Sequence, residues 1–330
     1  MQKKTKYIIR NSGLLLCLVL SGLYGMMQAQ TVADGEELYK KGKYAEAKQV
    51  FESVIQKDDK NAEAYCDLGQ VYLTHTFVGY DIEKAVENTE KAVEIAPGNA
   101  HIQYMYGAAL GIKVQNAGVL KQAFLAPKVK QAFVRSVELD PQFIPARVAL
   151  AQYYMMAPGI MGGSEDEAWK QVDEIIKQDE LQGRMVKAGF LSRNKKNEEA
   201  EKEFQILVAA YPKEWKVYHR YGYFCFRLER YDDAMKQFQK YIALRPDTAD
   251  SYQSYAEALL KKGDVDQAMK YLDQSLKLDQ QYVPAIISLG EAYQLKGMKK
   301  EAKEHYEQAL TLSQNEYYKK QAEKKLKEVE

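Results

Sequence analysis

Small and aromatic residues return along this chain at a fixed interval of 34 positions. Four alanines mark the interval, and each is followed four residues later by Phe, Leu or Tyr; they are Ala200, Ala234, Ala268 and Ala302. Large apolar residues fill positions between them, as expected for helices that bury one face. A constant period of this length predicts a solenoid in which pairs of helices stack and each pair buries its apolar face against the next.

Each period is predicted to hold two antiparallel helices, helix A and then helix B. Small residues in helix A let the two helices approach closely; they include Gly69, Gly222, Ala256 and Gly290. Prolines end helix B, because proline cannot continue a helix; they are Pro97, Pro141, Pro212 and Pro246. In the last two units, Gln280 and Gln314 replace the proline, which marks those boundaries less sharply.

The spacing resembles that of the tetratricopeptide repeat family. The eighth unit carries much of the family pattern, at Leu289, Gly290, Tyr293, Gly297, Ala302, Tyr306 and Ala309. The second and sixth units match at Leu68, Gly69, Tyr72, Ala85, Ala92 and Pro97, and at Tyr218, Tyr221, Gly222, Ala234, Phe238 and Pro246. The resemblance implies an all-α fold, a right-handed superhelical solenoid of antiparallel helix pairs whose A helices line a concave groove. It also implies a protein-binding function.

We predict eight repeats and a C-terminal capping helix. The repeats span 30–61, 62–99, 100–143, 144–180, 181–214, 215–248, 249–282 and 283–316, and the cap spans 317–330. Helix A of the first repeat is expected at about Ala33–Lys41. A cap with a polar outer face ends the stack. A basic tail that binds a membrane or nucleic acid is the less favoured alternative, because Glu323, Glu328 and Glu330 dilute its charge.

Repeats two, three and four exceed the period, and in each the extra residues fall at the turn between helix A and helix B. Insertions at equivalent positions of a solenoid project from one edge, so we expect a continuous rim. The rim loop of repeat four is predicted to include Pro158, Gly159, Gly162, Gly163 and Ser164. It resembles a loop of exported bacterial tetratricopeptide proteins of undefined role.

The loop of repeat four permits two interpretations. Ser164 is a candidate N-cap, and Glu167 would complete a capping box. The paired glycines before it could also present backbone N–H groups to an anion. A wide, packed turn is favoured over an anion site, because no Lys or Thr follows as a phosphate loop requires.

The resemblance places part of helix A on the concave groove. The candidate partner-binding residues are Tyr104, Met155, Met156, Met185, His219, Tyr223 and Phe226. Soft aromatic and Met-rich surfaces of this kind suit peptides or partner helices of loose sequence. The alternative is that several of these side chains are interface core. The carboxylate clamp found in some family members is not expected, because no Asn stands at the equivalent helix A positions.

Residues 1–29 have the pattern of a signal peptide. Basic residues precede an apolar run at 13–23, and a small-residue cleavage site lies near Ala29. The run is shorter than the roughly 20 residues that a spanning helix needs. We therefore expect export to the periplasm or beyond and no stable membrane span after cleavage; an uncleaved anchor is the alternative.

Charge and cysteine content narrow the function further. The chain has 47 basic and 46 acidic residues, and loss of the signal peptide would remove four basic ones. With no basic excess to neutralise phosphates, nucleic-acid binding is not expected. Cys66 and Cys225 stand on distant repeats, too far apart for a disulfide, so both are predicted to be free and buried.

The chain carries no recognisable catalytic motif. Its four histidines, His75, His101, His219 and His305, lack metal-ligand spacing, and no nucleophile elbow, phosphate loop or dinucleotide fingerprint occurs. We expect no enzyme, cofactor or metal. The predicted function is a protein-interaction scaffold of the bacterial cell envelope that binds a peptide or helix in its groove. Glycan or small-ligand binding at the rim of repeats two to four is the alternative, and self-association through a terminal repeat is a third.

Overall fold

The computed structural model describes residues 31–329 apart from 75–76, 116 and 314. Within these residues the chain forms seventeen α-helices and one 3-10 helix, η1 (Gly159–Met161), and no strand. The predicted signal peptide and His75 lie outside the described residues. The all-α fold class is therefore confirmed.

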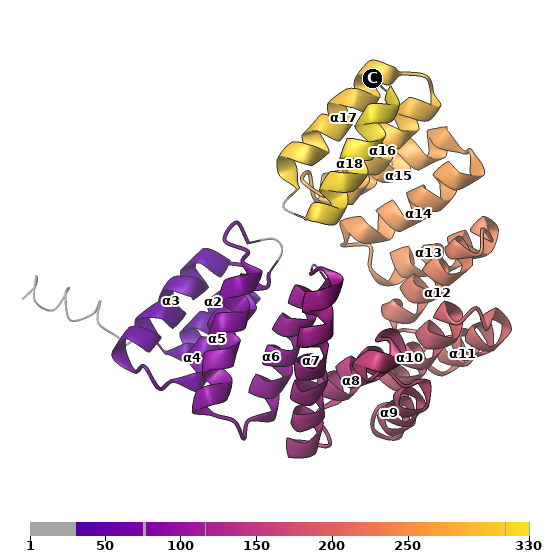
Figure 1. The fold of residues 1–330 in the computed structure, drawn as a ribbon. Helices are drawn as coiled ribbons and strands as arrows, with labels where there is room; N and C mark the ends of the chain where they lie inside the picture. The colour runs from indigo at the N-terminus through magenta and orange to yellow at the C-terminus, as the bar shows by residue number, and fades with distance from the viewer. Residues whose placement is uncertain (1–30, 75–76, 116, 314, 330) are drawn as a thin grey trace, which may run out of the picture.

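The helices form eight consecutive pairs and a final helix. The A helices are α2 (Val32–Lys40), α4 (Ala62–Tyr72), α6 (Ala100–Gln115), α8 (Ile144–Met156), α10 (Glu180–Arg193), α12 (Trp215–Arg227), α14 (Ala249–Lys262) and α16 (Val283–Leu295). The B helices are α3 (Tyr44–Lys57), α5 (Ile82–Ile95), α7 (Val119–Leu139), α9 (Glu165–Gln178), α11 (Asn197–Ala210), α13 (Tyr231–Leu244), α15 (Val265–Leu278) and α17 (Lys299–Leu312). Figure 1 shows the pairs following one another round an arc, from the indigo N-terminal repeats to the yellow C-terminal ones.

The periodic alanines explain the close packing within each pair. Ala200, Ala234, Ala268 and Ala302 are all completely buried, so helix A can approach the start of helix B without an intervening side chain. The four prolines stand where they were expected: each follows the C-cap residue of a B helix, as Pro246 follows Arg245 after α13.

Repeat three departs from the prediction of a long loop. Its extra residues lengthen the helices, so α6 has 16 residues, α7 has 21, and only residues 116–118 separate them. Pro127 lies inside α7. The expected rim of three loops is therefore wrong at its centre, where a helical hairpin stands between the loops of repeats two and four.

The final helix, α18 (Glu316–Val329), packs on α17 and α16. Ala322 and Val329 are buried there against a cluster that includes Ile286, Ile287 and Tyr306. The C-terminal capping helix of the predicted fold is thus confirmed. Glu323 and Lys324 lie on this helix and are exposed.

Two further features concern the cysteines and the apolar character of the helices. Cys66 and Cys225 are free and buried, as expected. None of the described helices has the length and apolar character required to cross a membrane.

Candidate binding surface

An apolar hollow of the concave face lies between α6, α7 and α8, in repeats three and four. It encloses a cavity of about 410 Å³. Tyr104 and Met156, two of the predicted groove residues, line it together with Phe133. Its polar side chains are Gln115, Gln122 and Gln152. A mostly apolar wall with a few amides suits an apolar side chain or a small apolar ligand.

The rim loop of repeat four closes one side of this cavity. Pro158 and Met161 contribute to the wall. The hydroxyl of Tyr153 lies 2.6 Å from the carbonyl oxygen of Met161 and 2.9 Å from that of Ala126 on α7, and its single proton is shared between these two acceptors. This side chain therefore holds the loop against the neighbouring helix.

The glycines of the loop have structural explanations. Gly162 has a φ of 87°, and a Cβ on Gly163 would stand 1.8 Å from the carbonyl oxygen of Ala157. The amides of Gly162, Gly163 and Ser164 all donate to carbonyl oxygens nearby, at 2.9–3.1 Å. They are already engaged, which favours the packed turn over the anion site.

The N-cap expected at Ser164 is present. Its hydroxyl accepts a hydrogen bond of 3.3 Å from the amide of Glu167 in the first turn of α9. The cap is one of the elements that fix the end of the loop, so the position of Pro158 on the cavity wall depends on it.

A second hollow of about 250 Å³ lies between α10 and α12, in repeats five and six. His219 and Tyr223 line it, as does Met185. Arg227, which sequence reasoning did not select, donates to the hydroxyl of Ser192 across this hollow. The predicted groove residues therefore divide between two hollows, and do not form one site.

Three of the predicted groove residues pack against the core or against neighbouring rings. Met185 is only 3% exposed and belongs to the core, so it forms the floor of the second hollow. Met155 packs on the core between α8 and α9. Phe226 packs edge-on against Tyr223 and Tyr231, at 6.2 Å and 5.4 Å between ring centroids. Inward positions of helix A face either the groove or the interface with a neighbouring helix, which explains why these three side chains are packed.

A polar network on repeats six to eight was missed by sequence reasoning. Asp250 at the start of α14 accepts hydrogen bonds of 2.8 Å from both Tyr241 and Tyr282, and His219 Nε2 lies 3.4 Å away. Burial raises the pKa of this carboxyl, but the three donors together outweigh burial and hold the pKa below its usual value. Tyr and Asp at helix A and turn positions, one repeat apart, could have indicated it.

The N-terminal end of the concave face holds a third hollow, of about 380 Å³. Glu36, Lys40, Asp67 and His101 are among its lining residues. Burial, reinforced by the Glu36 and Glu63 carboxylates, raises the pKa of Asp67 to about 7. This carboxyl is therefore part-protonated near neutral pH.

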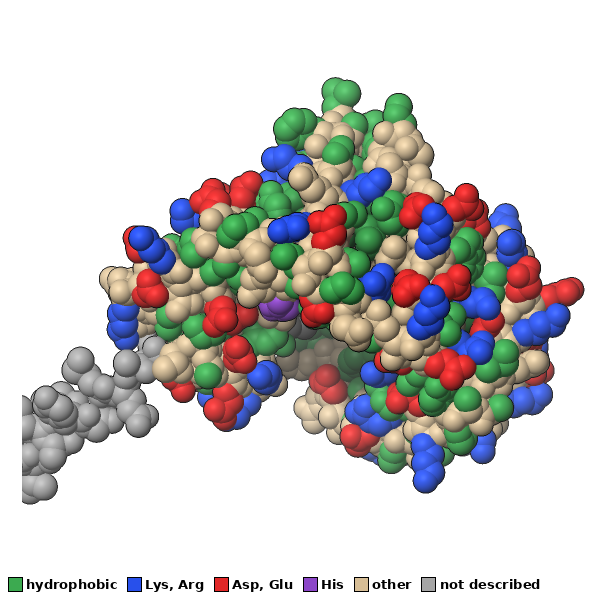
Figure 2. Space-filling view, turned by 90° about the horizontal axis from the view of Figure 1, so that it is seen from below, with side chains coloured by type: hydrophobic (Ala, Val, Ile, Leu, Met, Phe, Trp, Pro, Cys, Tyr) green, Lys and Arg blue, Asp and Glu red, His purple; other side chains and the backbone are tan. Residues whose placement is uncertain are grey.

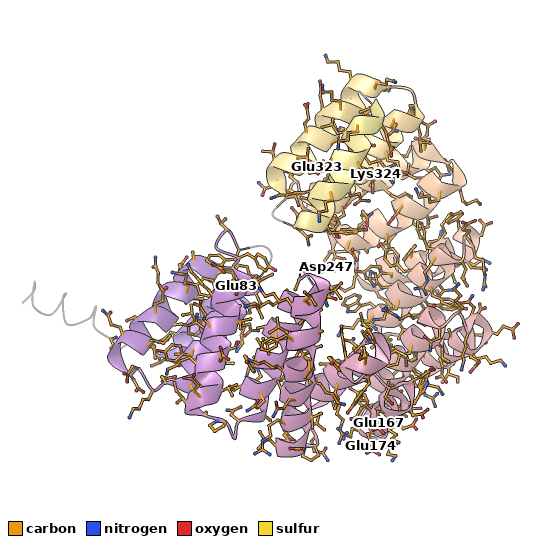
Figure 3. All side chains as sticks on the ribbon, in the orientation of Figure 1. Glu83, Glu167, Glu174, Asp247, Glu323 and Lys324 are labelled. Carbon is orange, nitrogen blue, oxygen red and sulfur yellow. The ribbon has the colours of Figure 1, made fainter. Side chains whose placement is uncertain are left out.

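Many other charged side chains form pairs at the surface. Glu167 and Glu174, on α9 in Figure 3, each lie 2.6 Å from a lysine three residues on, Lys170 and Lys177. Figure 2 shows acidic and basic side chains mixed over much of the face that it presents. Among the described residues, no group of three or more His, Cys, Asp or Glu side chains is arranged to hold a metal ion.

Sequence comparisons identify the repeats. Family models described as tetratricopeptide (TPR) repeats match residues 35–75, 191–249, 225–289 and 259–323, together more than half of the chain. The unmatched central part includes the cavity between α6, α7 and α8 and most of the inserted residues. No curated protein matches the chain.

Two solved structures illustrate the similarity of the fold. Yeast Tom70 superposes with a TM-score of 0.68 at 18% identity, over 87% of this chain and 58% of that one. A monomeric mutant of IFIT1, solved with Gppp-AAAA, superposes with a TM-score of 0.55 at 16% identity, over 89% of this chain and 70% of that one. The chain thus spans 58% of the length of Tom70. TPR repeats generally mediate protein–protein interaction, and by its repeats and its fold this chain belongs to the tetratricopeptide repeat family.

Proposed function

We propose that the protein is a non-enzymatic scaffold that binds an extended or helical segment of a partner protein on its concave face. The observation that carries the proposal is the apolar cavity between α6, α7 and α8, at the middle of the array. An apolar side chain of the partner would be buried beside Tyr104, Phe133 and Met156, whereas the glutamines would bond to its backbone.

The arrangement of hollows supports a segment over a compact ligand. Hollows of about 380, 410, 250 and 190 Å³ follow one another along the A helices from repeat one to repeat eight. One chain segment can place successive side chains in such a series, and its affinity then rests on a few anchors. The flexible Met156 at the cavity wall allows anchors of different shape.

The cellular setting is part of the proposal. The basic and apolar start of the chain supports export into a bacterial envelope, as a periplasmic or secreted protein. The near balance of acidic and basic residues argues for a protein partner rather than nucleic acid.

Small-ligand binding remains the second candidate, with a narrower site. The cavity between α6, α7 and α8 has insertion residues on two sides and amides on its wall. A volume of about 410 Å³ lies within the range of small-molecule sites. The apolar wall favours an apolar molecule over the glycan predicted as the alternative.

Substitution of two glycines can block the first and the second hollow separately, without disturbing the fold. Gly111 lines the first hollow and Gly189 the second. A Cβ on Gly111 would meet only Val129, at 3.9 Å, and a Cβ on Gly189 would meet nothing within 4 Å. Gly111→Leu and Gly189→Leu therefore add a side chain to open space on a helix, where Leu is favoured over Gly. Each variant is the matched control of the other.

The test is a pull-down from envelope extract with residues 31–330, compared with the two variants and analysed by mass spectrometry. We expect a protein that the wild type retains and Gly111→Leu loses. Equal recovery by all three would contradict binding at this hollow. A small apolar molecule that native mass spectrometry detects on the wild type but not on Gly111→Leu would instead support the second candidate.

A further inference from the structure

The first half of α7 has an outward apolar face that the groove does not use. Gln122, Ala126, Val129 and Phe133 face the cavity, at helical spacing. The opposite side presents Leu120 and Phe124, which are 89% and 70% exposed. Val119, the first residue of the helix, is 74% exposed, and Ile160 of η1, which contacts α7, is 96% exposed. We call these four residues the crest.

The two elements that carry the crest are packed against each other. η1 contacts α7, and the Tyr153 hydroxyl bridges their carbonyl oxygens. Lys130 on α7 also reaches the carbonyl oxygen of Gly162 after η1, at 3.4 Å. Exposed apolar residues held on a fixed support are unusual at a solvated surface and mark a place of contact.

The two segments that carry the crest hold basic residues and no acidic ones. No Asp or Glu occurs between Glu94 and Glu138, whereas that stretch holds Lys113, Lys121, Lys128, Lys130 and Arg135. None occurs between Asp140 and Glu165 either. This contrasts with the even mixture of charge in the chain as a whole. Acidic side chains come from neighbouring helices. Glu83 of α5 contacts Lys113 and lies 3.9 Å from Lys121, and α9 begins with Glu165, Asp166 and Glu167.

Two lysines of α7 lie beside the apolar residues of the crest. Lys121 and Lys128 are seven residues apart and so share one side of α7, next to Phe124. Lys128 Nζ lies 5.6 Å from the centre of the Phe124 ring. Figure 2 shows hydrophobic side chains at the tip of the ridge that projects at the top of that view, with Lys and Arg side chains on its flank.

We infer that the crest docks the protein on a lipid surface with anionic headgroups. Leu120, Phe124 and Ile160 would enter the boundary between headgroups and acyl chains, and Lys121 and Lys128 would lie among the anionic headgroups. A protein groove is the poorer occupant, because these side chains project from a convex edge and cannot be enclosed by a small partner segment. The inference does not depend on what the concave face binds.

The test is flotation of residues 31–330 with lipid vesicles. All described helices belong to this segment, and its use removes the apolar run at 13–23, which could itself bind lipid. Vesicles of phosphatidylcholine with 30 mol% phosphatidylglycerol are compared with pure phosphatidylcholine, in low and in 0.5 M salt. We expect flotation with the anionic vesicles only, and its loss at high salt.

Two pairs of variants separate the apolar and charged contributions. Leu120→Ser with Phe124→Ser should weaken partition to the anionic vesicles at least tenfold. Lys121→Gln with Lys128→Gln should weaken it about fivefold for each charge removed. Their controls are Leu278→Ser with Leu295→Ser, also exposed apolar residues, and Lys300→Gln with Lys303→Gln, whose acidic partners lie 4.0 and 3.8 Å away.

The results distinguish a lipid surface from a protein partner at the crest. Loss of flotation in the crest variants but not in the controls supports the lipid surface. Absence of flotation by the wild type, equal binding to both vesicle types, or equal loss in crest and control variants would overturn it. Capture of a protein through the crest without any vesicle binding would also overturn it, in favour of a protein interface.

Discussion

Gly222 on α12 lies directly against the ring of Phe238 on α13, so that a Cβ on the glycine would stand 2.4 Å from Cε1 of the ring. Three other repeats contain the same contact, between Gly35 and Phe51, Gly107 and Phe133, and Gly290 and Tyr306, at 2.4–2.6 Å. In these repeats the backbone of helix A thus packs directly on an aromatic ring of helix B. The contact fixes how far the two helices of a pair slide past one another.

Gly222→Ala is expected to destabilise the protein by about 1–3 kcal/mol, the usual cost of overpacking a core. The Phe238 ring is completely buried and cannot move aside without displacing its neighbours. The matched control is Gly189→Ala, in helix A of the previous repeat, whose Cβ would meet nothing within 4 Å. Since Ala is the better helix former, the control should be neutral or stabilising by up to about 1 kcal/mol.

Urea denaturation followed by circular dichroism measures both variants. Equal stability of Gly222→Ala and the wild type would mean that the ring relocates at little cost. In that case the glycine would be explained by something other than the packing of α12 on α13.

The same glycine–aromatic pairs show why the fold could be predicted. In three of the four pairs the two residues are 16 positions apart, and the pair recurs with the period. A local rule repeated along the chain therefore specifies the entire array. Repeat three breaks the rule, because Gly107 and Phe133 are 26 apart and the extra residues continue both helices. An apolar insertion such as V-L-K-Q-A-F-L has no single local signal that distinguishes a longer helix from a loop.

The candidate site was less predictable than the fold. Tyr104 and Met156 do line the cavity between α6, α7 and α8, but Met185 is buried. Inward helix A positions face either the groove or the next repeat, and a small rotation of the helix decides which. Asp250 was missed because its three donors come from three helices or turns, which only the superhelix brings together.

Asp67 is expected to make the N-terminal repeats less stable as pH rises. Its pKa, raised by burial to about 7, exceeds the value of about 3.9 for an unfolded chain, so the folded state binds the proton more tightly. Stability is then highest below about pH 4 for this group and falls as pH rises through 7. Since the carboxyl is partly exposed, we expect a loss of about 1–2 kcal/mol between pH 5 and pH 8, well below the full value of the shift.

Asp67→Asn tests this dependence, because the amide keeps the shape and removes the charge. The variant should be more stable than the wild type at pH 8, and the difference should become smaller as the pH falls to 5. Asp273→Asn, on the exposed face of α15, is the control and should show no such difference. If the wild type and Asp67→Asn differ equally at both pH values, the titration of Asp67 is not the cause.

Cys66 and Cys225 should resist thiol reagents in the native state. Burial raises the pKa of the Cys225 thiol to about 12 and that of Cys66 further, so almost no thiolate is present at pH 8. Modification of residues 31–330 by a disulfide reagent should proceed only through local opening of a repeat. Gly222→Ala should then accelerate labelling of Cys225, three residues away, and leave Cys66 unchanged. Fast labelling of both thiols in the native wild type would show that the repeats open readily.

Removal of α18 is expected to affect the last repeat before any other. A chain ending at Ser313 loses the contacts of Ala322 and Val329 and uncovers Ile286, Ile287 and Tyr306. Because each repeat of a solenoid contacts only its neighbours, hydrogen exchange should accelerate in α16 and α17 and stay unchanged in α2–α9. The uncovered apolar surface should also promote self-association, visible as a concentration-dependent mass in light scattering.

Glu323→Gln with Lys324→Gln, which changes only exposed side chains of α18 (Figure 3), is the control and should behave as the wild type in both measurements. If exchange rises uniformly along the whole chain, the array folds as one cooperative unit, and the terminal helix stabilises all eight repeats rather than the last.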